Sequence, residues 1–312
     1  MKLDINYFNV MPREEFRVLT AVELGMKNHE WVPPRLIEKI AKLKRGNAFK
    51  CIVELLKHKL IEHTNQTYDG YRLNYSGYDY LAISAFKRAG LSLSVEAKIG
   101  VGKESDIYLV RTSEGKLLVL KLARLGRTSF KSVKNNRDYI QKRTQYNWLY
   151  LSRLASTKEF AAMTALYQHK FPVPVAVFHN RHAILMSFVN GFPLQRLKSL
   201  KDPATVYNSL VDLLERLASF GIVHGDFNEF NLMLDSEQKL TMIDFPQVVS
   251  IGDKNAEFYF MRDLRCVNTF FERKFAFISD RTVDFSSIKW VHRLDQEIKA
   301  SGFDQNDQPL VG

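Results

Sequence analysis

The pattern of apolar residues changes at Gly90, and this change divides the chain into two parts that fold differently. Before Gly90, apolar residues recur at helical spacing. After it, "VEAKIGVGKESDIYLVRTSEGKLLVLKLARL" (95–125) alternates as strands do, with a turn at Glu114-Gly115. Helical patterns return at 146–170 and 206–221, while 182–190 reads as a buried strand and 231–245 as a hairpin. The sequence therefore predicts an α+β protein with a helical N-terminal module.

The N-terminal module has the pattern of a winged helix, and we place it in residues 1–92. Helices are expected over 12–26, 33–46 and 47–63, followed by a short strand "YRLN" after an Asp-Gly turn and a helix from about Ser76. Gly46 is the expected stop of the second helix. The third helix is expected to bury one apolar stripe, formed by Phe49, Ile52, Val53, Leu56 and Leu60.

In a winged helix, the third helix is the one offered to a nucleic-acid groove. Lys50, Lys57 and Lys59 on this helix, with Tyr71 and Arg72 on the wing, are the expected phosphate contacts. The alternative is an ordinary solvated helix face. Base-specific readout is not indicated, because the helix lacks a cluster of Asn, Gln or Arg.

The charge of the chain favours an anionic partner. The net charge is +11, and residues 111–158 hold twelve basic side chains against two acids, Glu114 and Asp138. Within this region the basic loop 124–147 interleaves aromatic with basic residues, which suits RNA, and its expected contacts are Arg127, Lys131, Lys134 and Arg137. A solvated flexible loop is the alternative.

Composition also limits the class of protein. No run approaches 18 uncharged apolar residues and the N-terminus lacks a signal-peptide pattern, so we expect no membrane partner and a location in the cytoplasm, with passage through the nucleus. Cys51 and Cys266 are too few for a disulfide framework and are expected to be reduced. A metal cluster built on cysteines is therefore not indicated.

A lysine in the middle of a strand is the first sign of a ligand site. Lys121 lies within "LVLKLAR", where a buried charge requires a partner, and Glu159 in the following helix is the expected carboxylate. Gly100 and Gly102 fall between two strands, where glycine lets the backbone approach a phosphate. By itself such a pair is more often a turn than a phosphate site.

The segment "HGDFNEFNLMLDSEQKLTMIDFPQ" (224–247) supplies three further polar side chains. Asp226 is followed by Asn231 after five residues and by Asp244 at the end of the hairpin. Carboxylate and amide oxygens are ligands that Mg²⁺ prefers, and Asp226 can orient or deprotonate an attacking oxygen. The glycine pair, strand lysine, helix glutamate and these three residues follow the order of the protein-kinase signature.

The chain resembles the second subfamily of the RIO family of atypical kinases. The resemblance is carried by "GVGKESDIY", "KLARLGRTSF", "NNRDY", "WLYLSRL", "HGDFNEFN" and "MIDFPQ", and by the winged helix before them. It implies a two-lobed kinase-like domain over 93–290, with lobes at 93–190 and 191–290, that lacks an activation segment and peptide-docking helices. Residues 291–312 are expected to form a helix and a tail. The resemblance suggests that this helix folds back on the nucleotide lobe.

The resemblance also implies a role for each site residue, with ATP and Mg²⁺ as cofactors. Asp226 and Asp244 would be catalytic, and Asn231 and Asp244 would bind the metal. The ATP-binding residues would be Gly100, Val101, Gly102, Lys103, Glu104, Ser105, Lys121, Glu159, Met186, Ser187 and Val189. Of these, Met186 would line the adenine pocket, with the Ser187 carbonyl and Val189 N–H bonding the base. Asn228, Ser105 and Pro246 depart from the pattern of ordinary kinases.

The expected function is an ATPase switch in maturation of the small ribosomal subunit, acting as a monomer when free. Asp244 would accept the phosphoryl group transiently, and the partners would be ribosomal RNA and proteins of the immature subunit. Three alternatives remain open: a serine/threonine kinase acting on a protein, a small-molecule phosphotransferase related to aminoglycoside and choline kinases, and an ATP-binding scaffold without turnover.

Overall fold

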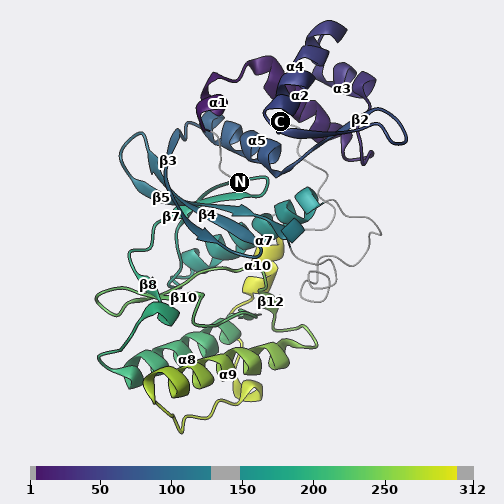
Figure 1. The fold of residues 1–312 in the computed structure, drawn as a ribbon. Helices are drawn as coiled ribbons and strands as arrows, with labels where there is room; N and C mark the ends of the chain where they lie inside the picture. Colours follow the sequence, from purple (N-terminus) through teal and green to yellow (C-terminus); the bar gives the residue numbers. More distant parts are fainter. Residues whose placement is uncertain (1–4, 128–147, 301–312) are drawn as a thin grey trace.

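A computed structural model describes residues 5–127 and 148–300 of the chain. Its N-terminal module consists of packed helices with a two-stranded wing at one side (Figure 1). The elements are α1 (Ile5–Val10), α2 (Arg13–Gly25), α3 (Pro34–Ala41), α4 (Arg45–Lys57), β1 (Ile61–Thr64), β2 (Gly70–Leu73) and α5 (Tyr75–Arg88). The wing strands are antiparallel, with Ile61 opposite Leu73. The expected winged helix is confirmed.

The predicted third helix, over 47–63, corresponds to α4, and its bounds and buried face differ from the prediction. α3 ends at Ala41, where Lys42 takes a left-handed conformation, so Gly46 lies inside α4 rather than at a helix stop. Residues 61–63 belong to β1 and not to this helix. Phe49 and Val53 are 59% and 44% exposed, and α4 instead buries Ala48, Ile52 and Leu55. Apolar residues occur on two faces of α4, and the neighbouring helices determine which face is buried.

The N-terminal lobe of the second domain is a five-stranded antiparallel sheet in the order β3-β4-β5-β7-β6. The strands are β3 (Leu93–Val101), β4 (Ser105–Thr112), β5 (Leu117–Ala123), β6 (Ala176–Asn180) and β7 (Ala183–Ser187). A short 3-10 helix, η1 (Leu125–Arg127), follows β5, and α7 (Trp148–Gln168) packs against β5, β6 and β7. The three strands expected after Gly90 and the strand within 182–190 are confirmed.

The two faces of β5 contact different helices, because its side chains alternate between them. Leu118, Leu120 and Leu122 pack with Ala82 and Phe86 of α5 in one buried cluster. Successive side chains of a strand point to opposite faces, so Lys121 faces away from α5 and meets α7. α5 therefore belongs to the cores of both the winged helix and the sheet.

The C-terminal lobe is built on two long helices, α8 (Pro203–Ser219) and α9 (Ala256–Phe275), shown at the bottom of Figure 1. The Asp202 side chain caps α8 by accepting from the Thr205 N–H at 3.1 Å. Small sheets lie between these helices and the N-terminal lobe, formed by β8 (Phe192–Pro193), β9 (Ile222–Val223), β10 (Leu232–Leu234), β11 (Leu240–Met242) and β12 (Val249–Ser250). The expected hairpin is β10–β11.

The end of the described chain returns towards the N-terminal lobe. The 3-10 helices η3 (Leu194–Arg196) and η4 (Phe285–Ser287) flank the C-terminal lobe, and α10 (Leu294–Ala300) lies beside α7 (Figure 1). His169, just after α7, and His292 both contact the carboxylate of Glu297 on α10. The expected helix in 291–312 is thus α10. No helix in the described ranges is long and apolar enough to cross a membrane.

Candidate active site

Lys121 joins the two lobes through two carboxylates. Its Nζ donates to Glu159 Oε1 of α7 at 2.6 Å and to Asp244 Oδ1, beyond β11, at 2.8 Å. Burial alone would lower the pKa of Lys121, but the charges of Asp244 and Glu159 raise it above its ordinary value. The lysine therefore remains a cation, and the contact expected between Lys121 and Glu159 is present.

Asp244 occupies an unusual backbone conformation at the end of the hairpin. Its φ of +69° lies in the left-handed region, which residues other than glycine adopt at a cost that surrounding contacts must offset. Its side chain is 37% exposed, against 6% for that of Glu159. Asp244 is therefore the carboxylate at Lys121 that a ligand can reach.

Asp226 and Asn231 form a second, adjacent group. Asn231 Nδ2 donates to Asp226 Oδ2 at 3.0 Å and to the Asp226 carbonyl at 2.9 Å, and Asn228 Nδ2 donates to Asp226 Oδ1 at 2.8 Å. Burial, followed by the charge of Asp244, raises the pKa of Asp226 to about 6. The negative charge of Asp244 thus acts on the Asp226 carboxyl.

The oxygens of this group fit Mg²⁺. The two side-chain hydrogen bonds of Asn231 use its amide nitrogen, so its side-chain amide oxygen is the atom that would coordinate a cation. With Asp244 it supplies the hard oxygen ligands that Mg²⁺ prefers, and a cation there would relieve the repulsion that raises the pKa of Asp226. Asn231 and Asp244 are therefore the residues that would hold the metal.

Asp263 is a site residue that the sequence analysis missed. This residue of α9 accepts hydrogen bonds from the backbone N–H groups of Gly225 (2.8 Å) and Phe227 (3.2 Å), on either side of Asp226. The Arg262 guanidinium also donates to the Gly225 carbonyl. Together they fix the loop that carries Asp226. The available signal was an aspartate on the buried, otherwise apolar face of α9.

The segment expected to bind phosphate, residues 100–105, contains the turn between β3 and β4. The Gly102 N–H donates to the Ser105 carbonyl at 2.7 Å, which closes the turn. Gly100 lies within β3 opposite Ile107, and not between the strands as predicted. A Cβ on Gly100 would lie only 3.3 Å from the Ile107 side chain, so close strand packing also accounts for this glycine. Val101 and Lys103 are exposed and Glu104 is half-buried.

The expected adenine-binding strand is β7 and its continuation. Met186 is buried in the core, and Ser187, the last residue of β7, lies opposite Leu118 of β5. The Ser187 N–H donates to the carbonyl of Val175, which lies between α7 and β6. This N–H is therefore already paired within the protein. The roles of the Ser187 carbonyl and the Val189 N–H stay predictions.

The residues expected to contact RNA differ in their surroundings, since some lie beside carboxylates of the same chain. Lys50 is exposed on α4, and Lys57 lies 3.3 Å from Glu54 on the same helix. Arg72 pairs with Glu62 at 2.8 Å and stacks over Trp31, and Arg127 pairs with Asp106 at 2.8 Å. The guanidinium groups of Arg72 and Arg127 thus have intramolecular partners. Lys131, Lys134 and Arg137 lie outside the described residues.

Comparison with known proteins gives the same picture over nearly the whole chain. The RIO domain family matches residues 106–285, and the family described as Rio2, N-terminal matches residues 8–89. A serine/threonine-protein kinase rio2 of Dictyostelium discoideum is 51% identical over 97% of this chain and 58% of its own length. The Schizosaccharomyces pombe protein of the same name is 46% identical over 98% of this chain and 90% of its own.

A solved structure agrees in fold. The crystal structure of the Rio2 kinase-ADP/Mg²⁺-phosphoaspartate complex from Chaetomium thermophilum matches with a TM-score of 0.86 and 46% identity, covering 97% of this chain and 95% of that one. Fold and site together define a two-lobed kinase-like domain whose carboxylate and amide oxygens suit a divalent cation. More particularly, the chain belongs to the RIO family, and its N-terminal domain is that of Rio2. It spans 58% of the length of the Dictyostelium relative.

Proposed function

We propose that this chain hydrolyses ATP through a transient phosphoryl group on Asp244 and that it acts as a switch on the maturing small ribosomal subunit. The observation that carries the proposal is the setting of Asp244. Its side chain is 37% exposed and held by Lys121, and its charge acts on the nearby Asp226. A carboxylate so placed can serve as a nucleophile as well as a metal ligand.

The reaction divides into two steps. In the first, an Asp244 oxygen attacks the γ-phosphorus, an O–P bond forms, and the bond to the β–γ bridging oxygen breaks to release ADP. In the second, a water oxygen attacks the phosphorus, Asp226 takes the proton, and the bond to Asp244 breaks. Mg²⁺ at Asn231 and Asp244 would neutralise charge on the phosphates. Lys121 supplies a fixed positive charge in both steps.

The region after Asp244 supports a switch over a protein kinase with a docked peptide. α9 begins at Ala256, soon after the short strand β12, which leaves no room for a long activation segment between them. One observation favours the alternative of a serine/threonine kinase acting on a protein, namely that the curated relatives bear this name.

We place the partner of the switch in the immature small ribosomal subunit, as ribosomal RNA and proteins. The support is the net charge of +11, which is concentrated in residues 111–158, and the exposed Lys50 and Phe49 on α4. The same proposal places the protein in the cytoplasm, with passage through the nucleus. It would act there as a monomer when not bound to the particle.

The test is a labelling experiment with γ-labelled ATP and Mg²⁺, in which protein-bound label and free phosphate are followed together. The proposal expects a label on the native protein that hydroxylamine removes, because hydroxylamine cleaves acyl phosphates, and no label on Asp244→Asn. A label that resists hydroxylamine would indicate serine or threonine. Phosphate release without any bound label would contradict the covalent step.

A further inference from the structure

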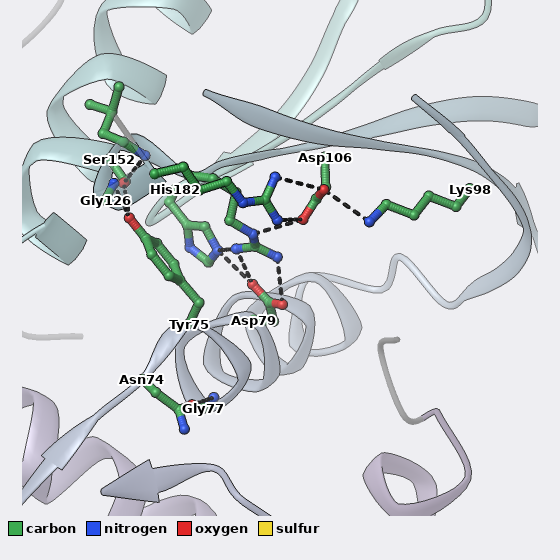
Figure 2. Close-up of polar contacts among 12 residues, drawn as sticks. Asn74, Tyr75, Gly77, Asp79, Lys98, Asp106, Gly126, Ser152 and His182 are labelled. Atoms are coloured by element: carbon green, nitrogen blue, oxygen red, sulfur yellow. Dashed lines mark hydrogen bonds and ion pairs between the residues drawn. The ribbon is translucent and has the colours of Figure 1, made fainter. Parts of the chain in front are cut away.

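A buried group of charged and polar side chains lies where the winged helix meets the N-terminal lobe. This Arg124 cluster consists of Arg124, Asp79, Asp106 and His182, and Figure 2 shows Asp79, Asp106 and His182 converging from different elements. Arg124 Nη1 and Nη2 each donate to Asp79 at 2.7 Å, and Arg124 Nε donates to Asp106 Oδ2 at 2.9 Å. His182 Nε2 lies 2.7 Å from Asp79 Oδ1.

The cluster is held by geometry as well as by charge. Arg124, Asp79 and Asp106 are only 4%, 5% and 2% exposed. Buried charges of this kind persist only when paired, and the planar guanidinium fork fixes both the distance and the orientation of a bidentate carboxylate. Asp79 belongs to α5 and Asp106 to β4, so one arginine connects α5 to the sheet.

The same cluster reaches the loop at residues 100–105 by two routes. The backbone N–H of Arg124 donates to the Glu104 carbonyl at 2.6 Å. Asp106 also accepts from Arg127 Nη1 and Nη2, at 3.0 and 2.8 Å, and Arg127 Nη1 donates to the Gly102 carbonyl at 3.3 Å. Two backbone carbonyls of the loop are therefore tied to the arginines of the segment 124–127.

A third set of contacts connects the same segment to α7. The Tyr75 hydroxyl of α5 accepts from the Gly126 N–H at 2.8 Å and lies 3.0 Å from Ser152 Oγ, which accepts from the Leu125 N–H at 3.2 Å (Figure 2). α7 is the helix that carries Glu159, the partner of Lys121. The winged-helix residues Tyr75 and Asp79 thus contact the segment 124–127, which bonds the loop, and Tyr75 also contacts α7, which carries Glu159.

We propose that Asp79 and Arg124 are positioning residues for ATP, and that the winged helix is in this way a structural part of the nucleotide site. By holding Arg124, Asp79 fixes the backbone N–H that bonds the Glu104 carbonyl. Through Asp106 and Arg127 it also fixes the Gly102 carbonyl, so the loop amides stay directed at the phosphates. The inference rests on the ATP use proposed above. A native protein that fails to bind nucleotide would reject that function, whereas the variants below test the positioning alone.

The chain offers a matched control for this proposal. Arg181 pairs with Glu23 of α2 at 2.7 and 2.6 Å, which is also a bidentate ion pair between the winged helix and the N-terminal lobe. Arg181 lies in the turn between β6 and β7, and its guanidinium also donates to the Leu81 carbonyl and to Asn180. Glu23→Gln therefore weakens the same junction without acting on residues 100–105.

The experiment measures KM for ATP, kcat and the hydrogen exchange of the amides of residues 102–105 in Asp79→Asn, Arg124→Lys and Glu23→Gln, each below its own Tm. For the first two we expect a rise in KM of about tenfold, corresponding to about 1.4 kcal/mol, a smaller change in kcat and faster exchange in the loop. Glu23→Gln should change KM less than about twofold. Arg127→Gln, at an exposed position, should give a smaller rise.

The positioning role of Asp79 and Arg124 can be supported or rejected by these variants. If Asp79→Asn fails to fold, Arg124→Lys and Arg127→Gln carry the test, since each alters the support of the loop while leaving Asp79 in place. Unchanged KM and loop exchange in these variants would overturn the proposal. So would equal increases in Glu23→Gln, because they would show that any loosening of the domain junction has the same effect.

Discussion

The Lys121 ammonium donates a 2.8 Å hydrogen bond to the Asp244 carboxylate, which connects β5 of the N-terminal lobe to the end of the β10–β11 hairpin in the C-terminal lobe. Lys121 is also paired with Glu159, so one cation lies between a buried carboxylate and an accessible one. This arrangement places the lysine beside the proposed phosphoryl acceptor. It also makes the three residues mutually dependent.

Replacing Lys121 by Met should lower kcat/KM for ATP hydrolysis by at least about 100-fold, or roughly 3 kcal/mol, because charge on the phosphates would lose its fixed cation. It should also destabilise the fold by about 3–5 kcal/mol, since Glu159 is left buried without its partner. Phosphate release and urea unfolding measure the two effects. Lys116→Met, at the exposed turn before β5, is the control and should change neither. Native-like turnover in Lys121→Met would contradict the assignment.

Asp226→Asn should retain ATP binding and the first phosphoryl transfer but slow the release of phosphate by about 100-fold or more, because the group that takes the proton of water is lost. Protein-bound label should therefore persist longer than in the native protein, as a pulse with γ-labelled ATP followed by unlabelled ATP would show. Asp244→Asn should carry no label at any time. Persistence of turnover at the native rate in either variant would exclude the proposed roles.

The Asp263 carboxyl should give a distinct pH dependence of stability. Burial raises its pKa to about 6 from the ordinary 3.8, although the Phe227 and Gly225 N–H groups oppose this. The folded protein then binds the extra proton between these values, so this carboxyl makes the free energy of unfolding fall as pH rises from about 4 to about 6, by roughly 3 kcal/mol in total.

Asp263→Asn should remove this contribution and should also lower kcat, because an amide can accept only one of the two loop hydrogen bonds. Denaturant unfolding between pH 4 and pH 7 measures the first effect. Glu272→Gln, on the exposed face of the same helix, should leave the pH profile as it is in the native protein. A profile for Asp263→Asn identical to that of the native protein would show that Asp263 does not titrate in this range.

Substitution of Lys50 and Lys57 by Ala together should weaken RNA binding and reduce the slope of log K against log salt by about two, because each lysine would neutralise one phosphate. ATP hydrolysis in the absence of RNA should be unchanged, because α4 lies outside the nucleotide site. Lys239→Ala with Lys254→Ala removes the same charge from exposed positions of the C-terminal lobe. An equal loss of RNA affinity in this control would mean that net charge, and not α4, controls binding.

Local patterns were enough to predict most elements and to select Lys121, Asp226, Asn231 and Asp244, which the structure brings into two adjacent groups. The alternation around Lys121 marks a strand with a buried charge, and the spacing of Asp226, Asn231 and Asp244 marks a loop and hairpin that hold oxygen ligands. Such features are decided by residues near one another in the chain, through side-chain periodicity and the conformations that turns require.

Partners far apart in the chain could not be predicted in the same way. The choice of Ala48, Ile52 and Leu55 as the buried face of α4, with Phe49 left exposed, depends on where α2 and α3 pack. The bonds from Asp263 to the loop of Asp226 span 36 and 38 residues. Both depend on the placement of whole helices, which one segment of sequence does not determine.

The sequence by itself determined which residues carry charge, where apolar and polar residues alternate as in strands, and the order of Asp226, Asn231 and Asp244 along the chain. Only the tertiary structure decided that Arg124 is buried between Asp79 of the winged helix and Asp106 of the sheet, and that Asp244 shares Lys121 with Glu159. The physical reason is that a buried charge needs a partner of opposite sign. Which partner it receives is set by the packing of α5, α7 and the sheet into one core.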